Sequence, residues 1–213
     1  MPQNPMIRAL VIFLIGLLIL LLGLAGWLYM QPRGQLDGGS FDSSTAGQES
    51  SLGVDYSLTS QDGSTVSRSD FAGSFRLYYF GYTFCPDVCP TSLAVMGQAM
   101  SRLERQDPEA AARIQPLFIT IDPERDTPEV LADYVVHFHP RLIGLTGSPE
   151  EIAAVAKGFR VFAQKGDERG ENDYLMDHTS AFILMDPEGR FIRLFTHGTP
   201  PEEIAAALAK IAG

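Results

Sequence analysis

The sequence predicts an α/β domain with a mixed central sheet, preceded by a linker and a single N-terminal transmembrane helix. Apolar strand-like runs alternate with helical patterns over residues 53–213, a Gly- and Ser-rich stretch lies before them, and an apolar run comes first. Alternating strands and helices are typical of α/β folds. The chain has 213 residues, which is enough for one domain with a full core. Its formal net charge of −10, without a basic stripe, argues against nucleic acid as a partner.

Residues 1–30 are predicted to be a membrane anchor. Residues 9–29 are an apolar run of 21 residues, which as a helix is long enough to cross a bilayer core of about 30 Å. A cleaved signal peptide is the alternative, but its apolar region is usually only about 7–15 residues long. Arg8 before the run and the acidic residues after it place the N-terminus in the cytoplasm. We therefore expect a single-pass protein of the bacterial inner membrane, with its soluble domain in the periplasm.

Residues 31–52 are predicted to be a flexible linker, because glycine and serine dominate this stretch. The domain at 53–213 should begin with a β-hairpin, since two short strands flank Asp62-Gly63, a strong turn signal. Thr127 and Ser148 each precede a proline and are predicted to cap helices. The remaining expected elements are strands at 75–81, 115–121, 142–145 and 161–164, helices at 91–105, 128–138 and 149–159, a hairpin of 180–185 with 191–195, and a closing helix at 200–211.

The two cysteines of the chain, Cys85 and Cys89, lie between the 75–81 strand and the 91–105 helix. Two neighbouring sulfur atoms can exchange electrons as a disulfide or bind a soft metal. We expect Cys89 to cap this helix or to lie in its first turn, with Cys85 in the loop before it. The start of a helix has unpaired N–H groups, which favour a thiolate there. A purely structural disulfide is disfavoured, because so short a loop would constrain the unfolded chain little. A dithiol loop after the first core strand makes a thioredoxin-like fold the leading prediction.

Three motifs, in this order, resemble those of the SCO/SenC family of copper-binding proteins of cytochrome c oxidase assembly. They are FGYTFCPDVCP at 80–90, IDPERDTP at 121–128 and YLMDHT at 174–179. The resemblance covers residues 52–212 and implies a thioredoxin-like fold. It also implies that one copper ion is bound through Cys85, Cys89 and His178.

The ligand chemistry agrees with that implication. Thiolate sulfur favours Cu(I), imidazole accepts both Cu(I) and Cu(II), and zinc normally takes a fourth ligand. Asp177 is a candidate partner that would orient the imidazole of His178.

From the resemblance we expect a membrane-anchored copper metallochaperone that supports assembly of the binuclear copper centre of cytochrome c oxidase. It would exchange ligands rather than catalyse a reaction. Its expected partners are the copper-bearing subunit of the oxidase, a periplasmic copper donor, a thiol reductase, and the membrane through the N-terminal helix.

A second function class stays open, in which Cys85 and Cys89 form a redox disulfide. The chain would then be a thiol-disulfide oxidoreductase or a redox sensor. Enzymes of this kind with a thioredoxin-like fold usually have Cys-x-x-Cys, whereas here three residues intervene. Peroxide reduction by Cys85 is a third and weaker reading.

The other polar candidates are given structural roles. His137 and His139 lie two residues apart and are predicted to be solvated, since they do not share a helix face. His197 is predicted to lie in a turn. The acidic residues of the 121–128 motif are predicted to form a solvated turn between a strand and a helix.

Overall fold

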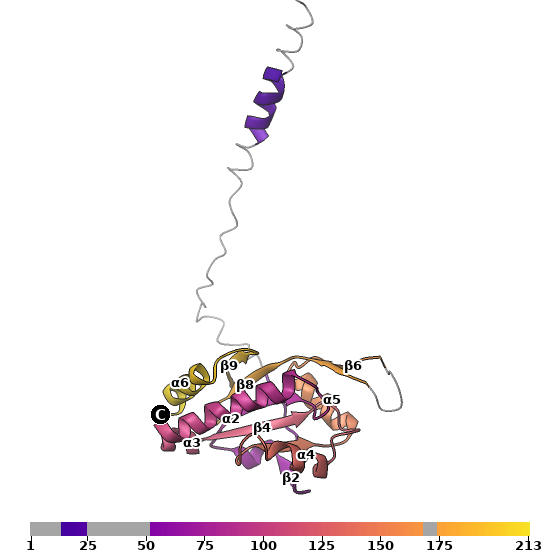
Figure 1. Ribbon diagram of the computed structural model, residues 1–213, viewed down its shortest axis with the longest axis vertical. Coiled ribbons are helices and arrows are strands. Elements are labelled where there is room, and N and C mark those ends of the chain that lie inside the picture. The colour runs from indigo at the N-terminus through magenta and orange to yellow at the C-terminus, as the bar shows by residue number, and fades with distance from the viewer. Residues whose placement is uncertain (1–13, 25–51, 168–173) are drawn as a thin grey trace, which may run out of the picture. The chain divides into compact units, whose positions relative to one another are not determined.

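The computed structural model describes residues 14–24, 52–167 and 174–213 (Figure 1). The chain divides into two units, Met1–Glu49 and Ser50–Gly213. In the first unit, residues 14–24 form a helix. The rest of the predicted 9–29 span and almost all of the 31–52 linker lie outside the described residues, so both stay predictions. Within the described ranges, no helix combines the length and apolarity that crossing a membrane requires.

The second unit contains strands and helices in alternation. In chain order they are β1 (Ser57–Ser60), β2 (Thr65–Ser67), the 3-10 helix η2 (Arg68–Phe71), β3 (Phe75–Gly81), α2 (Val88–Gln106), α3 (Pro108–Ala112), β4 (Ile114–Thr120), α4 (Pro128–Val135), β5 (Ile143–Thr146), α5 (Pro149–Gly158), β6 (Ala163–Lys165), β7 (Met176–His178), β8 (Ala181–Met185), β9 (Phe191–Thr196) and α6 (Pro201–Ala212).

The larger of the two described sheets is mixed, as predicted. Its seven strands have the order β2-β1-β5-β4-β3-β8-β9. β3, β4 and β5 are parallel, whereas β1, β2, β8 and β9 pair antiparallel with their neighbours. The predicted N-terminal hairpin is the β1–β2 pair. All seven residues of β3 are buried, which is typical of a central strand in a sheet covered on both faces.

Helices cover both faces of this sheet. Right-handed crossovers from β3 to β4 and from β4 to β5 put α2 and α4 on the same face. On that face Phe118 lies between Tyr79 and Tyr134, with ring centroids 6.4 and 5.8 Å away. α6 packs beside α2, as Figure 1 shows. On the other face, the ring of Phe159, at the end of α5, lies 4.7 Å from that of Tyr78.

Side-chain caps begin two of these helices, as the sequence predicts. The N–H of Val130 donates to Thr127 Oγ1 at the start of α4. At the start of α5, Ser148 and Glu151 form a reciprocal capping box. Such caps satisfy N–H groups that have no partner within the helix.

The structure differs from the prediction mainly next to the metal-ligand candidates. α2 begins at Val88 rather than at residue 91, and Cys89 lies in its first turn, one of the two positions expected for it. β7 was not predicted. It pairs with β6 in a separate two-stranded sheet, in which Ala163 lies opposite His178. Three residues with no apolar alternation give no local strand signal, so β7 exists only through this pairing.

Candidate metal centre

The structure brings together the three side chains predicted to bind copper. Cys85 lies in the loop after β3, Cys89 in the first turn of α2, and His178 at the end of β7. Their ligand atoms, the two Sγ atoms and a ring nitrogen, all lie within 4.8 Å of one another. Both cysteines are free thiols. The three residues therefore form one group although 89 positions separate Cys89 from His178.

The imidazole of His178 presents Nε2 to the sulfurs. Its Nδ1 lies 3.1 Å from the carbonyl oxygen of Thr179, so Nδ1 carries the proton and donates it. Nε2 then has its lone pair free and lies 3.4 Å from Cys89 Sγ. Burial lowers the pKa of His178 below its ordinary value, which keeps the ring neutral at pH 7. A neutral ring with an oriented Nε2 is the form that binds metals.

Two tyrosine rings restrict the imidazole further. Tyr79 and Tyr82 meet the ring of His178 edge-on, at interplanar angles of 84° and 85°. The side chain of Asp177 is exposed, and its charge opposes the fall in the pKa of His178. The hydrogen-bond partner of Nδ1 is thus a backbone carbonyl oxygen, and the orienting role of Asp177 stays a prediction.

Cys89 differs from the expectation of a stabilised thiolate at the helix start. Its side chain is fully buried, and this burial raises its pKa to about 12. The loss of solvent outweighs the helix terminus, so the thiol is protonated at neutral pH. The N–H of Cys89 instead donates to Cys85 Sγ, 3.4 Å away. The helix terminus therefore serves the half-buried sulfur of Cys85.

Gly81 lets the sulfur of Cys89 lie against the end of β3. A Cβ atom at this position would be 2.8 Å from Cys89 Sγ and 2.9 Å from a ring carbon of Tyr79. Real Cβ contacts essentially never come this close. The absent side chain of Gly81 is thus part of the cavity that holds the thiol.

The acidic motif after β4 is buried where a solvated turn was expected. Asp122 is 3% exposed and Asp126 is 0% exposed. Burial raises the pKa of Asp126, while hydrogen bonds from Thr120 and Thr83 oppose that rise. Glu124 is the exposed member of this loop. The prediction of a solvated turn is therefore wrong for the two aspartates.

The remaining histidines are not members of this group. His139 is buried and its Nε2 lies 3.4 Å from Glu104, so the prediction of a solvated pair holds only for His137. His197 lies in the turn after β9, where its Nδ1 is 3.3 Å from Ser92 Oγ.

The donor set fits a single soft metal ion. Ligand atoms held about 2.0–2.3 Å from one ion lie at most about 4.6 Å apart, on the distances known for imidazole and thiolate on zinc. The observed limit of 4.8 Å needs a shift of only a few tenths of an ångström. A cavity of about 260 Å³ adjoins the group, lined by Tyr82, Pro86, Leu175 and Ser180 among others, and Cys85 and His178 face it.

Sequence reasoning missed several residues around this group. Tyr79, Tyr82 and Gly81 contact the ligands, and Asp126 and Tyr174 hold the segments that carry them. All of them except Tyr79 lie within the three motifs, so membership in a motif was the signal that could have found them. Their roles depend on contacts between distant segments and have no local pattern.

Comparison with known proteins gives relatives over most of the chain. The mitochondrial SCO2 homolog of Bos taurus is 38% identical over 213 residues, covering 98% of this chain and 77% of that protein. The mitochondrial SCO1 homolog of Homo sapiens is 42% identical over 158 residues, covering 74% of this chain. This alignment spans only 52% of the human protein, about half its length.

These relatives correct the predicted location. The sequence predicts a single-pass protein of the bacterial inner membrane with a periplasmic domain. The two relatives described above are mitochondrial proteins instead. The positive-inside tendency reports only the direction of insertion, which does not distinguish one kind of membrane from another.

A solved structure and a family model cover the same part of the chain. The structure of Bradyrhizobium japonicum ScoI with copper bound is 42% identical, with a TM-score of 0.68. The match covers 75% of this chain and 98% of that one. The family model described as SCO1/SenC matches residues 44–213. With this match and the thioredoxin-like fold that it shares with solved Sco structures, the chain belongs to the SCO1/SenC family.

Proposed function

We propose that this chain is a copper metallochaperone that supports assembly of the binuclear copper centre of cytochrome c oxidase. It binds one copper ion through Cys85, Cys89 and His178. The observation that carries the proposal is the convergence of these three ligand atoms, from three separate segments, to within 4.8 Å. The copper-bound structure of a protein 42% identical to this one supports the choice of metal.

The ligand set favours copper over zinc. Two thiolates and one imidazole suit Cu(I), whereas structural zinc takes four protein ligands. Among the described residues, the group that could hold a metal ion consists of these three side chains, one fewer than structural zinc takes. Copper binding displaces the thiol protons and leaves His178 neutral, so the loaded Cu(I) site carries one net negative charge in a largely buried setting.

Transfer of the ion proceeds by ligand exchange. Cys85 is the less buried of the two cysteines and faces the open cavity, so an incoming thiolate or imidazole reaches the metal from that side. The acceptor is the copper-bearing subunit of the oxidase, and a separate copper donor loads the site. Metal–ligand bonds are exchanged, the thiolates that the ion leaves take up protons, and copper remains Cu(I) throughout.

Copper titration of the reduced chain tests this proposal. The wild type should bind one equivalent of Cu(I) against a competing chelator. Cys85→Ser and Cys89→Ser should lose most of this affinity, because a hydroxyl is a poor ligand for Cu(I). His178→Ala should bind more weakly, while His137→Ala, which removes an exposed histidine, should bind as the wild type does. Unchanged affinity in both serine variants would refute the proposal.

A redox function of the same cysteines is the second candidate. Both are free thiols with sulfurs within 4.8 Å, and a disulfide requires them to approach to about 2.05 Å. Disulfide formation would release two electrons and two protons to a disulfide or quinone oxidant and would remove both thiolate ligands. Loading would then require a thiol reductase. Cu(I) uptake measured before and after oxidation separates the two states, and equal uptake would contradict this link.

A further inference from the structure

One loop forms hydrogen bonds with both chain segments that carry the candidate metal ligands. This loop, residues 122–126, connects β4 to α4 and is called the 122–126 loop below. It contains no residue of the Cys85, Cys89 and His178 group. Its side chains nevertheless bond to the segment before Cys85 and to the segment before His178.

Asp126 accepts hydrogen bonds that position the segment preceding the cysteines. Its carboxylate accepts the backbone N–H of Thr83 at 3.1 Å and the hydroxyl of Thr83 at 2.6 Å. It also accepts the hydroxyl of Thr120, at the end of β4, at 2.6 Å. Thr83 lies two residues before Cys85. Because Asp126 is fully buried, these bonds are shielded from water and are strong.

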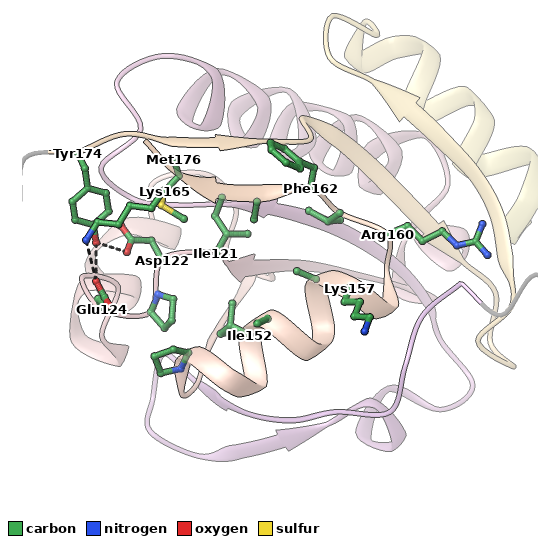
Figure 2. Close-up of a pocket in the computed structure, with 16 residues that line it drawn as sticks. Ile121, Asp122, Glu124, Ile152, Lys157, Arg160, Phe162, Lys165, Tyr174 and Met176 are labelled. Atoms are coloured by element: carbon green, nitrogen blue, oxygen red, sulfur yellow. Dashed lines mark hydrogen bonds and ion pairs between the residues drawn. The ribbon is translucent and has the colours of Figure 1, made fainter. Parts of the chain in front are cut away.

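Tyr174, in the segment before His178, contacts the same loop through Asp122 and Arg125. Its hydroxyl donates to Asp122 at 2.7 Å, and the guanidinium of Arg125 lies 3.6 Å from its ring centroid. Arg125 also donates to the carbonyl oxygen of Tyr174 at 3.1 Å and to Asp122 at 2.5 Å. Figure 2 shows Tyr174 beside Asp122, Glu124 and Lys165 at one end of a cavity of about 630 Å³.

Tyr174 lies four residues before His178 and two residues before β7, the strand that carries His178. β7 has three residues and, among the described strands, pairs with β6 alone, outside the seven-stranded sheet. On its other side, the N–H of Met176 donates to the hydroxyl of Tyr82 at 3.2 Å. So short a strand has few ladder bonds, and the position of His178 depends on contacts made by the residues next to it.

We propose that Asp126 and Tyr174 are positioning residues, and that the 122–126 loop sets the separation between the cysteine pair and His178. Asp126 acts on the cysteine side and Tyr174 on the histidine side. The expected effect on copper affinity rests on the proposed function. The positioning itself is a property of the metal-free protein.

Amide hydrogen exchange of the metal-free, reduced protein tests the positioning directly. Tyr174→Phe removes one hydroxyl and should increase exchange in residues 174–181, with residues 82–90 unchanged. Thr83→Val removes one hydrogen bond to Asp126 and should increase exchange in residues 82–90, with residues 174–181 unchanged. Tyr134→Phe is the matched control, because the buried hydroxyl of Tyr134 has no hydrogen-bond partner among the described residues. Exchange in Tyr174→Phe identical to that in Tyr134→Phe would overturn the proposal.

Measurements of copper affinity in single and double variants test which candidate ligand each residue positions. Tyr174→Phe should weaken Cu(I) binding by about 3- to 10-fold, the order of one lost hydrogen bond. In the His178→Ala background this loss should disappear, whereas the loss caused by Thr83→Val should persist. An equal loss for Tyr174→Phe in both backgrounds would indicate a general structural effect and refute the assignment. If the wild type bound no copper, the proposed function would fail, and the exchange experiment would still decide the positioning.

Discussion

Substituting Gly81 by alanine should damage the metal centre without touching a ligand. The new Cβ would lie 2.8 Å from Cys89 Sγ, 2.9 Å from a Tyr79 ring carbon and 3.2 Å from a Phe118 ring carbon. Ordinary contacts between such atoms are about 3.5–4.0 Å. The sulfur of Cys89 must therefore move by about 0.7 Å or more, and the two ring carbons by about 0.3–0.6 Å or more. Tyr79, Cys89 and Phe118 are all 0% exposed and have no open space to move into. The sulfur of Cys89 is therefore displaced.

Two costs follow from this displacement. Overpacking a core typically costs about 1–3 kcal/mol of stability. Metal–ligand distances are tolerant only to about 0.2 Å, so a sulfur moved by about 0.7 Å no longer shares an ion with His178 at good geometry. We expect Cu(I) affinity to fall by about 10- to 100-fold, which is about 1.4–2.7 kcal/mol.

The assay is a Cu(I) competition titration together with urea unfolding of the metal-free protein. Gly144→Ala is the matched control, since its Cβ would lie 3.0 Å from Val135 Cγ1 in the same core, with no metal ligand among its nearest neighbours. Both variants should lose stability, and only Gly81→Ala should lose affinity. If the two variants bound copper equally well, the close contact between Gly81 and the sulfur would not control the site.

Three further predictions concern proton release, helix capping and the buried ion pair. Because the pKa of Cys89 is raised to about 12 and that of His178 is lowered, copper affinity should rise about tenfold per pH unit between pH 7 and 9 from Cys89 alone; a competition titration with no pH dependence would contradict this. Ser148→Ala should destabilise the protein by about 1 kcal/mol in urea unfolding through loss of its cap, with copper affinity unchanged as the check that the effect is local. Arg125→Ala should cost about 3–5 kcal/mol in the same assay, because Asp122 would be left as a buried charge without its ion-pair partner; a loss below about 1 kcal/mol would refute the importance of that pair.

Local chemistry was sufficient for many elements of the fold. The apolar run of β3, the Asp62-Gly63 turn and the caps Thr127 and Ser148 each predicted an element that the structure contains. These signals depend on residues within a few positions of one another. The mixed sheet followed from their order along the chain.

Contacts between distant segments explain what local chemistry missed. β7 pairs with β6 across a connection that includes residues 168–173, and no pattern within its three residues predicts a strand. The helix start suggested a thiolate at Cys89, but packing removed its solvent and reversed the expected direction of the pKa. The sequence predicts a solvated turn at Asp126, but the side chain is buried against Thr83 from another loop.

The amino-acid sequence alone determined which side chains are chemically able to bind a soft metal, and in which order the strands and helices occur. Periodicity, caps and sulfur chemistry are properties of residues close together in the chain. Only the tertiary structure decided that His178 meets the two sulfurs, which thiol is buried, and which loop connects the two halves of the centre. Burial and through-space distance arise when segments far apart in the chain pack together, and no short stretch of sequence encodes them.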